Sequence, residues 1–240
     1  MQWHYDETFE GYLSAVFQVY KSGDETAIFC GNQETQLGLD TKQTVITDLN
    51  HSQRVQRKLE AIDQDLPRRI YYAWLSREPE IEQAILSYIR LCILQDQDVC
   101  DQRYLEVVRT VLGASRKVGA DVYHYQKFVR FVRAGASVYL ADITPDYDVL
   151  DLLSGFFEAR LEGFNFVIRD LKRSKCLVWD QRHHWISYDP RLMQPVPNEG
   201  NYEQLWQTYF KHIAIPERVN PKLQTLHVPR RYRKHMTEFM

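Results

Sequence analysis

The residues best suited to chemistry lie at 217–240. This segment contains six lysines and arginines but only two glutamates, in a chain of formal net charge −2. Such cations can neutralise phosphates, and a tyrosine among them can stack on a nucleobase. The sequence therefore predicts a nucleic-acid site made of Arg218, Lys222, Arg230, Arg231, Tyr232, Arg233 and Lys234. A basic tail can also dock on an acidic patch of its own fold or of a partner, and this alternative stays open.

Two prolines divide this tail into halves with different expected roles. Val219, Leu223 and Leu226 recur at spacings of four and three, so "ERVNPKLQTL" is expected to pack against the fold. Pro229 disfavours helix continuation from the residue before it, so "PRRYRKH" is expected to begin as a separate element. The second half is predicted to contact phosphate.

A second basic strip lies in "HYQKFVRFVR", where cations alternate with aromatic residues. The predicted nucleic-acid contacts in it are Lys127, Arg130 and Arg133. The aromatic residues follow helical spacing, which indicates a buried stripe. The cations therefore fit a solvated helix face as well as a binding site.

The stretch "ADITPDYDVLD" clusters acidic residues that could hold a divalent metal for nucleic-acid hydrolysis, with Asp142, Asp146 and Asp148 as ligands. It lacks the glycine and bidentate glutamate of a calcium loop. Acids are also favoured at a helix start, where they cap amides and oppose the helix dipole. Asp146 is therefore expected to cap a helix, and the metal-dependent hydrolase is the alternative.

Histidines and cysteines give no sign of a metal centre or cofactor. His183 and His184 are adjacent, so on a strand they would point to opposite sides and could not share one ion. No two of the four cysteines form a C-x-x-C pair or a similar close spacing. The sequence predicts no metal and no cofactor, and His183 and His184 are expected in a surface hairpin turn.

The elements that must position these residues follow from periodicity. Residues 1–50 indicate a strand at "WHY", a helix capped by Asp6 or Thr8, and an irregular stretch with a short strand in "QTVITDL". Residues 51–134 indicate a helical block in which Asn50 and Asp101 are expected caps. Two glycines could break its last helix, at Gly113 and Gly119.

The period then changes from helix to strand. Residues 135–190 indicate a strand, a helix and three further strands, and residues 191–240 a helix after Asn201 followed by the basic tail. The inward face of that helix is expected to hold Leu205, Trp206, Tyr209, Phe210 and Ile213. The sequence thus predicts one α+β domain over 1–240, a helical block packed with a small, mainly antiparallel sheet.

Composition agrees with a folded protein outside the membrane. Hydrophobic residues make up 44% of the 240 residues, enough for a sizeable core. The start, "MQWHYDETFE", lacks the basic and apolar regions of a signal peptide. No apolar run approaches the roughly 20 residues of a membrane helix. We therefore expect a soluble cytoplasmic protein with reduced cysteines.

Five segments also carry a resemblance. They are "YDETFEGYLSAVFQVY", "IYYAWLSREPEIEQAILSYIRL", "VLGASRKVGADVY" with "KFVRFV", "ITPDYDVLDLLSGFF" and "ERVNPKLQTLHVPRRYRKHMTEF". In this order they resemble a bacterial family of DNA metabolism or repair proteins that accompany a radical SAM protein. Related domains are fused to a uracil-DNA glycosylase-like domain. The acid and histidine that commonly precede "F-x-R-F" in that family stand here as Asp121 and Tyr123, and His124 follows them.

The resemblance implies a process and a partner rather than a reaction. A radical SAM enzyme needs three closely spaced cysteines for its iron–sulfur cluster, and this chain lacks that spacing. The leading hypothesis is an accessory protein that binds DNA, a radical SAM or uracil-DNA glycosylase-like partner, or both. The alternatives are the hydrolase above and a purely structural partner subunit.

Overall fold

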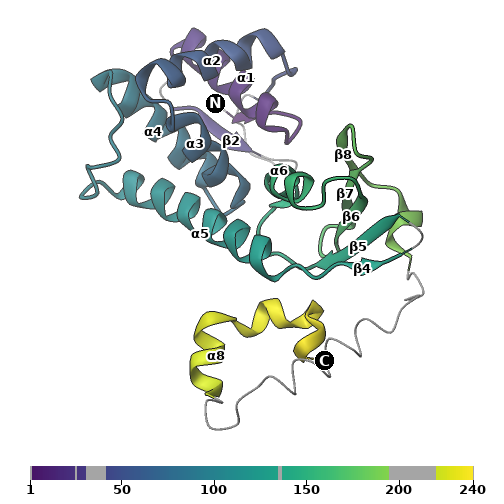
Figure 1. The fold of residues 1–240 in the computed structure, drawn as a ribbon. Coiled ribbons are helices and arrows are strands. Elements are labelled where there is room, and N and C mark those ends of the chain that lie inside the picture. Colours follow the sequence, from purple (N-terminus) through teal and green to yellow (C-terminus); the bar gives the residue numbers. More distant parts are fainter. Residues whose placement is uncertain (1, 25, 31–41, 135–136, 195–219, 240) are drawn as a thin grey trace. The chain divides into compact units, whose positions relative to one another are not determined.

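The computed structural model describes residues 2–24, 26–30, 42–134, 137–194 and 220–239 (Figure 1). The chain divides into two compact units, Met1–Gly119 and Ala120–Met240. Each unit combines helices with a small sheet, which confirms the α+β class. The single domain over 1–240 stays a prediction. Arg218, Val219 and the helix expected after Asn201 lie outside the described residues.

The first unit begins with a parallel sheet. Strand β1 (Gln2–His4) lies between β2 (Ile28–Cys30) and β3 (Lys42–Thr44), and both neighbours run parallel to it. Helix α1 (Phe9–Ser22) connects β1 to β2, and a crossover of this kind is what joins parallel strands. Thr8 is its N-cap, and the Thr8 hydroxyl accepts a hydrogen bond from the Gly11 amide. This confirms one of the two expected caps.

The helical block follows. It contains α2 (Leu49–Ile62), α3 (Leu66–Leu75), α4 (Ile81–Gln95) and α5 (Glu106–Phe128). Side chains from α1, α3 and α4 form the core of the first unit, including the fully buried Tyr12, Ile70, Ile85, Tyr88 and Ile89. Helix α5 crosses the boundary between the two units at Gly119.

Three expectations about this block were wrong in detail. Asp48, rather than Asn50, caps α2, because its carboxylate accepts hydrogen bonds from the first amides of that helix. Asp101 lies five residues before α5 and does not cap it. Helix α5 continues through Gly113 and Gly119, since a glycine costs only about 1 kcal/mol relative to alanine.

The second unit is built on a five-stranded sheet. Its strands are β4 (Val132–Arg133), β5 (Val138–Ile143), β6 (Asn165–Asp170), β7 (Lys175–Trp179) and β8 (His184–Ser187), in that spatial order. The pair β5–β6 is parallel and the other pairs are antiparallel. The parallel pair arises because α6 (Leu150–Arg160) crosses over between the two strands. Phe157, Phe166, Ile168 and Leu177 form its buried core.

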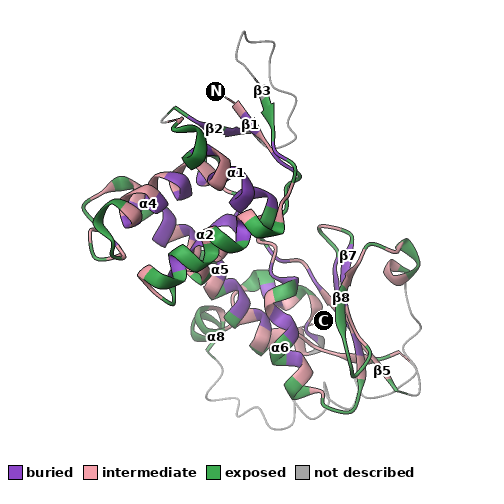
Figure 2. Ribbon diagram, turned by 90° about the horizontal axis from the view of Figure 1, so that it is seen from above, coloured by how far each residue is buried: buried purple, intermediate pink, exposed green. Residues whose placement is uncertain are grey.

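The C-terminal segment consists of short helices. They follow η1 (Pro190–Met193) and comprise α8 (Pro221–His227), η3 (Arg230–His235) and η4 (Thr237–Phe239). Leu223 is 50% and Leu226 73% exposed, so the expectation that this half packs inward was wrong for both leucines (Figure 2). The basic half instead buries Tyr232, and Met236, which directly follows this half, is also buried. As expected, this half begins a new element directly after Pro229.

Candidate nucleic-acid interface

Tyr232 anchors the basic half of the tail within the second unit. Tyr232 is only 3% exposed. The ring centroid lies 4.9 Å from that of His124, 5.1 Å from Tyr125 and 5.5 Å from Phe128. These three rings come from the last two turns of α5. Tyr232 therefore packs as a core aromatic residue and has no open face for a nucleobase.

The Tyr232 hydroxyl is held by three polar neighbours. It donates to Oδ1 of Asp121 over 2.7 Å, and Arg231 donates to it. Nδ1 of His124 lies 3.2 Å away. Because the single phenol proton goes to the carboxylate, His124 must donate from Nδ1 to the phenol oxygen. Burial and the hydrogen bond to Asp121 both raise the pKa of Tyr232, so it stays a neutral phenol.

Asp121 is the buried acid at the centre of this cluster. Asp121 is fully buried, and its Oδ2 has no hydrogen-bond partner among the residues described. Arg231 brings positive charge to it, with Nη2 3.5 Å from Asp121 Oδ1 and Nη1 2.6 Å from Asp146 Oδ2. Arg231 thus joins the tail to two acids of its own unit, which is the docking alternative raised by the sequence.

Three other predicted contacts are also engaged within the chain. Arg233 donates to the Val228 carbonyl over 3.0 Å, and its guanidinium lies 4.5 Å from the Phe239 ring centroid. Arg130 pairs with Glu238 over 2.7 Å. Lys127 places its ammonium 3.5 Å from the centroid of an exposed tyrosine ring. These interactions hold the tail and the end of α5 in place.

Three further predicted cations are directed to solvent. Lys222, Arg230 and Lys234 are exposed and have no ion-pair partner among the described residues. Arg133 is exposed on β4, but it takes part in an interaction within the chain. The structure therefore separates the described part of the predicted site into side chains engaged within the chain and three cations that remain available to a ligand.

The acidic cluster does not converge on one point. Asp142 pairs with Arg169 over 2.8 Å, Asp148 pairs with Lys175, and Asp146 pairs with Arg231. Asp146 is not the cap of α6 as expected, because that position is Val149, without a side-chain cap hydrogen bond. Charge neutralisation by these cations, rather than capping, accounts for the cluster.

The described residues contain no group of three or more histidine, cysteine or acidic side chains that could hold a metal ion. His183 lies in the turn between β7 and β8, as expected, whereas His184 is the first residue of strand β8 and pairs with Trp179. Burial raises the pKa of both Cys92 and Cys176 to about 11, so both remain thiols at neutral pH. Each helix in the described part of the chain is too short or too polar to cross a membrane.

Reasoning from the residues alone missed the part played by Asp121 and His124. A usable signal exists, because Asp121, His124, Tyr125 and Phe128 recur at spacings of three and four on one helical face. An acid on an otherwise aromatic stripe requires a buried partner. The sequence does not show that the partner is a tyrosine more than 100 positions later.

Comparison with known proteins assigns most of the chain to a family. The family model described as a domain of unknown function, DUF4130, matches residues 79–238. The chain belongs to this family. The matched region contains Asp121, Arg231 and Tyr232, whereas residues 1–78 lie outside it. No curated protein and no solved structure matches the chain.

Proposed function

We propose that this DUF4130 protein is a DNA-associated accessory protein that contacts phosphates with the exposed cations of its C-terminal segment. The observation that carries the proposal is the separation of anchoring from exposed cations. Tyr232 and Arg231 fix the segment, while Arg230 and Lys234 on η3 and Lys222 on α8 face solvent. Anchored cations without a partner suit phosphate binding, because little side-chain and backbone freedom remains to be lost.

A salt titration tests the phosphate contacts. Each phosphate neutralised contributes about 0.9 to the slope of log affinity against log salt on duplex DNA. The triple variant Lys222→Gln, Arg230→Gln and Lys234→Gln should flatten that slope by roughly two to three. The thermal melt should barely move, since exposed substitutions change stability by under about 0.5 kcal/mol.

A charge-matched control keeps this test specific. Arg103, Arg160 and Arg182 are exposed cations elsewhere in the chain. Their replacement by glutamine removes the same charge and should leave the slope nearly unchanged. Equal losses in the two triple variants would reduce the interface to general electrostatic attraction, and an unchanged slope in the first would refute the phosphate contacts.

The resemblance of the sequence adds a partner to this proposal. The chain supplies no iron–sulfur or glycosylase motif of its own, so that chemistry would belong to a radical SAM protein or a uracil-DNA glycosylase-like protein bound to it. Specific interfaces bury on the order of 1,200–2,000 Å². Gel filtration of the chain mixed with such a protein from the same genome should therefore show a shifted common peak. Separate peaks at micromolar concentration would refute a stable complex.

A further inference from the structure

Helix α8 presents two leucines to solvent beside the cations proposed to contact phosphate. Leu226 is 73% and Leu223 50% exposed. An α-helix turns by about 100° per residue, so the order of side chains around this face of α8 is Lys222, Leu226, Leu223 and His227. The two leucines therefore form a narrow apolar strip, the leucine strip, between two exposed polar residues.

The leucine strip is held in place although α8 is short. Asn220 caps the helix, because its side-chain oxygen accepts a hydrogen bond from the Leu223 amide over 3.0 Å. Arg233 donates to the Thr225 hydroxyl over 3.2 Å, which ties α8 to η3. Thr225 lies about 100° from Leu226 around the helix, so this tie leaves the leucine strip open. Side chains fixed in this way lose little freedom when they meet a ligand.

The charge around the leucine strip favours an anionic ligand. Residues 220–237 contain no acid. The acid that follows them, Glu238, pairs with Arg130 over 2.7 Å. Three cations of the same stretch have no ion-pair partner among the described residues, namely Lys222, Arg230 and Lys234. An apolar strip among such cations matches a ligand that offers both negative charge and apolar surface.

The small size of the leucine strip favours the base stack of DNA over a protein or a membrane. A specific protein interface involves roughly 20–30 residues on each side, and leucine is under-represented among its hot spots. Helices that lie on a membrane surface are often about 20–30 residues long, whereas α8 has seven residues. In contrast, proteins that kink DNA insert single apolar side chains, leucine among them, between two base pairs.

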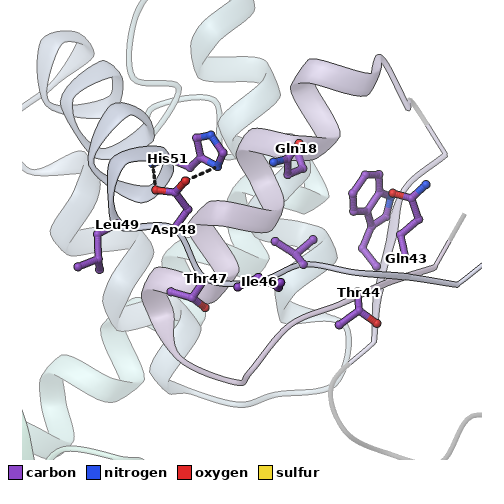
Figure 3. A pocket seen from close by; sticks show the side chains of 10 residues that line it. Gln18, Gln43, Thr44, Ile46, Thr47, Asp48, Leu49 and His51 are labelled. Atoms are coloured by element: carbon purple, nitrogen blue, oxygen red, sulfur yellow. Dashed lines mark hydrogen bonds and ion pairs between the residues drawn. The ribbon is translucent and has the colours of Figure 1, made fainter.

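A pocket in the first unit is less suited to an anionic ligand. Its volume is about 630 Å³, and it opens beside α1 and the start of α2 (Figure 3). Asp48 lines this pocket. Two further acids accept hydrogen bonds from lining residues, namely Asp6 from Thr47 and Asp24 from Trp3. Because these acids repel phosphate, we expect nucleic acid at the leucine strip and not at the pocket.

We propose that the leucine strip is a wedge that enters the base stack of DNA, while Lys222, Arg230 and Lys234 hold the neighbouring phosphates. This inference rests on the proposed function and specifies its ligand as duplex DNA with a weakened base step, such as a mismatch or an unpaired nucleotide. Unstacking costs least at such steps, so the wedge selects them without reading the base sequence. Leu226 leads the wedge, because it is the more exposed leucine and neighbours Lys222 one turn away.

Binding to a matched duplex and to the same duplex with one unpaired thymidine tests the wedge. The unpaired nucleotide should raise the affinity of wild type by about fivefold or more. A 2-aminopurine beside it should become brighter on binding, because this base fluoresces more when it is unstacked. Leu226→Ala should reduce the preference to less than about twofold, whereas Leu226→Met keeps a side chain able to wedge and should retain it. Leu94→Ala, at an exposed leucine of α4, is the control and should behave as wild type.

Salt titration separates the wedge from the phosphate contacts. Leu226→Ala should keep the wild-type slope of log affinity against log salt, because it removes no charge. Suppose that the triple glutamine variant flattens this slope while Leu226→Ala still prefers the duplex with the unpaired thymidine. The wedge would then be wrong and the phosphate contacts would stand. The opposite pair of results, an unchanged slope and a lost preference, would refute those contacts and retain the wedge.

Four further results would overturn the wedge. One is equal binding of wild type to the two duplexes. The others are interactions that Leu226→Ala abolishes: binding to vesicles of anionic phospholipid, a concentration-dependent dimer, or the complex with the radical SAM protein. Those three would assign the leucine strip to a membrane, to a second copy of the chain or to the partner protein. Circular dichroism of each variant checks that it folds.

Discussion

The two halves of the C-terminal segment use their side chains in opposite ways. Helix α8 presents Leu223 and Leu226 at helical spacing, yet they are 50% and 73% exposed. The half that follows is dominated by cations, yet Tyr232 within it is only 3% exposed, and Met236 directly after it is 2% exposed. Burial here follows the partner that each side chain meets, and local hydrophobic spacing does not predict it.

The partner that decides the difference is the aromatic and acidic face of α5. The Tyr232 ring packs against aromatic rings of α5, and its hydroxyl donates a hydrogen bond to the Asp121 carboxylate. Burial of Tyr232 therefore leaves none of its polar side-chain atoms without a hydrogen bond. The seven-residue α8 offers its leucines on a helix too short to be stable by itself. The basic half is therefore the structural half, and some of its cations remain for a ligand.

The largest expected effect is the loss of stability that follows replacement of Tyr232. Tyr232→Ala removes a buried ring and leaves Asp121 without its donor, and should lower the free energy of unfolding by about 3–5 kcal/mol. Leu226→Ala is the control in the other half and should cost less than about 0.5 kcal/mol. Urea denaturation of both variants makes the measurement. Similar small effects would show that the basic half does not pack as described.

Removing only the hydroxyl should sharpen the comparison by isolating the buried hydrogen bond. Tyr232→Phe keeps the ring but deprives Asp121 of its donor, so we expect a loss of about 1–3 kcal/mol in unfolding free energy. Tyr123→Phe, at an exposed ring of α5, the helix that also carries Asp121, is the control and should be neutral. A double-mutant cycle with Asp121→Asn should show coupling of at least about 0.5 kcal/mol. Additive effects would mean that the two groups do not interact.

Much of the fold follows from local patterns in the sequence. The strand at residues 2–4, the cap at Thr8 and the strands β5 to β8 are all set by short-range spacing and turn residues. The parallel β5–β6 pair was missed, because pairing direction depends on where the chain returns after α6. The uninterrupted α5 was missed because tertiary packing outweighs two glycines.

The site was predictable in composition and not in arrangement. The sequence identifies Arg231 and Arg230 equally, since both are cations next to each other in the tail. Only the fold brings Asp121 and Asp146 to Arg231 and leaves Arg230 exposed. These contacts span 85 to 110 positions, and no local pattern encodes such a distance.

This pair of arginines provides the next and smaller test. Arg231→Gln should cost about 0.2–1 kcal/mol in unfolding free energy, because its side chain is half exposed and solvent screens both ion pairs. Arg230→Gln should leave stability unchanged. Salt titration of DNA binding should give the reverse order, with the slope lowered by Arg230→Gln and retained by Arg231→Gln. Equal behaviour of the two variants in both assays would remove the distinction between anchoring and exposed cations.

The smallest expected effect is a dependence of stability on pH through His235, whose ring is half-buried at the end of η3. Burial lowers the pKa of His235, Lys234 and Arg169 lower it further, and Asp142 opposes them. Its Nε2 has no hydrogen-bond partner in the described part of the chain. The unfolded chain therefore binds a proton near the ordinary pKa of about 6.5, while the folded chain binds it only at lower pH. The stabilisation by neutral His235 is full above the ordinary pKa of about 6.5 and is lost as the pH falls toward the folded pKa.

Wild type should consequently lose more stability than His235→Gln between pH 7.5 and 5.5, as measured by urea denaturation at both pH values. His227→Gln, at an exposed histidine of α8, is the control and should follow wild type. If His235→Gln also followed wild type, the His235 ring would be solvated in the folded chain. The buried part of the basic half would then not include His235.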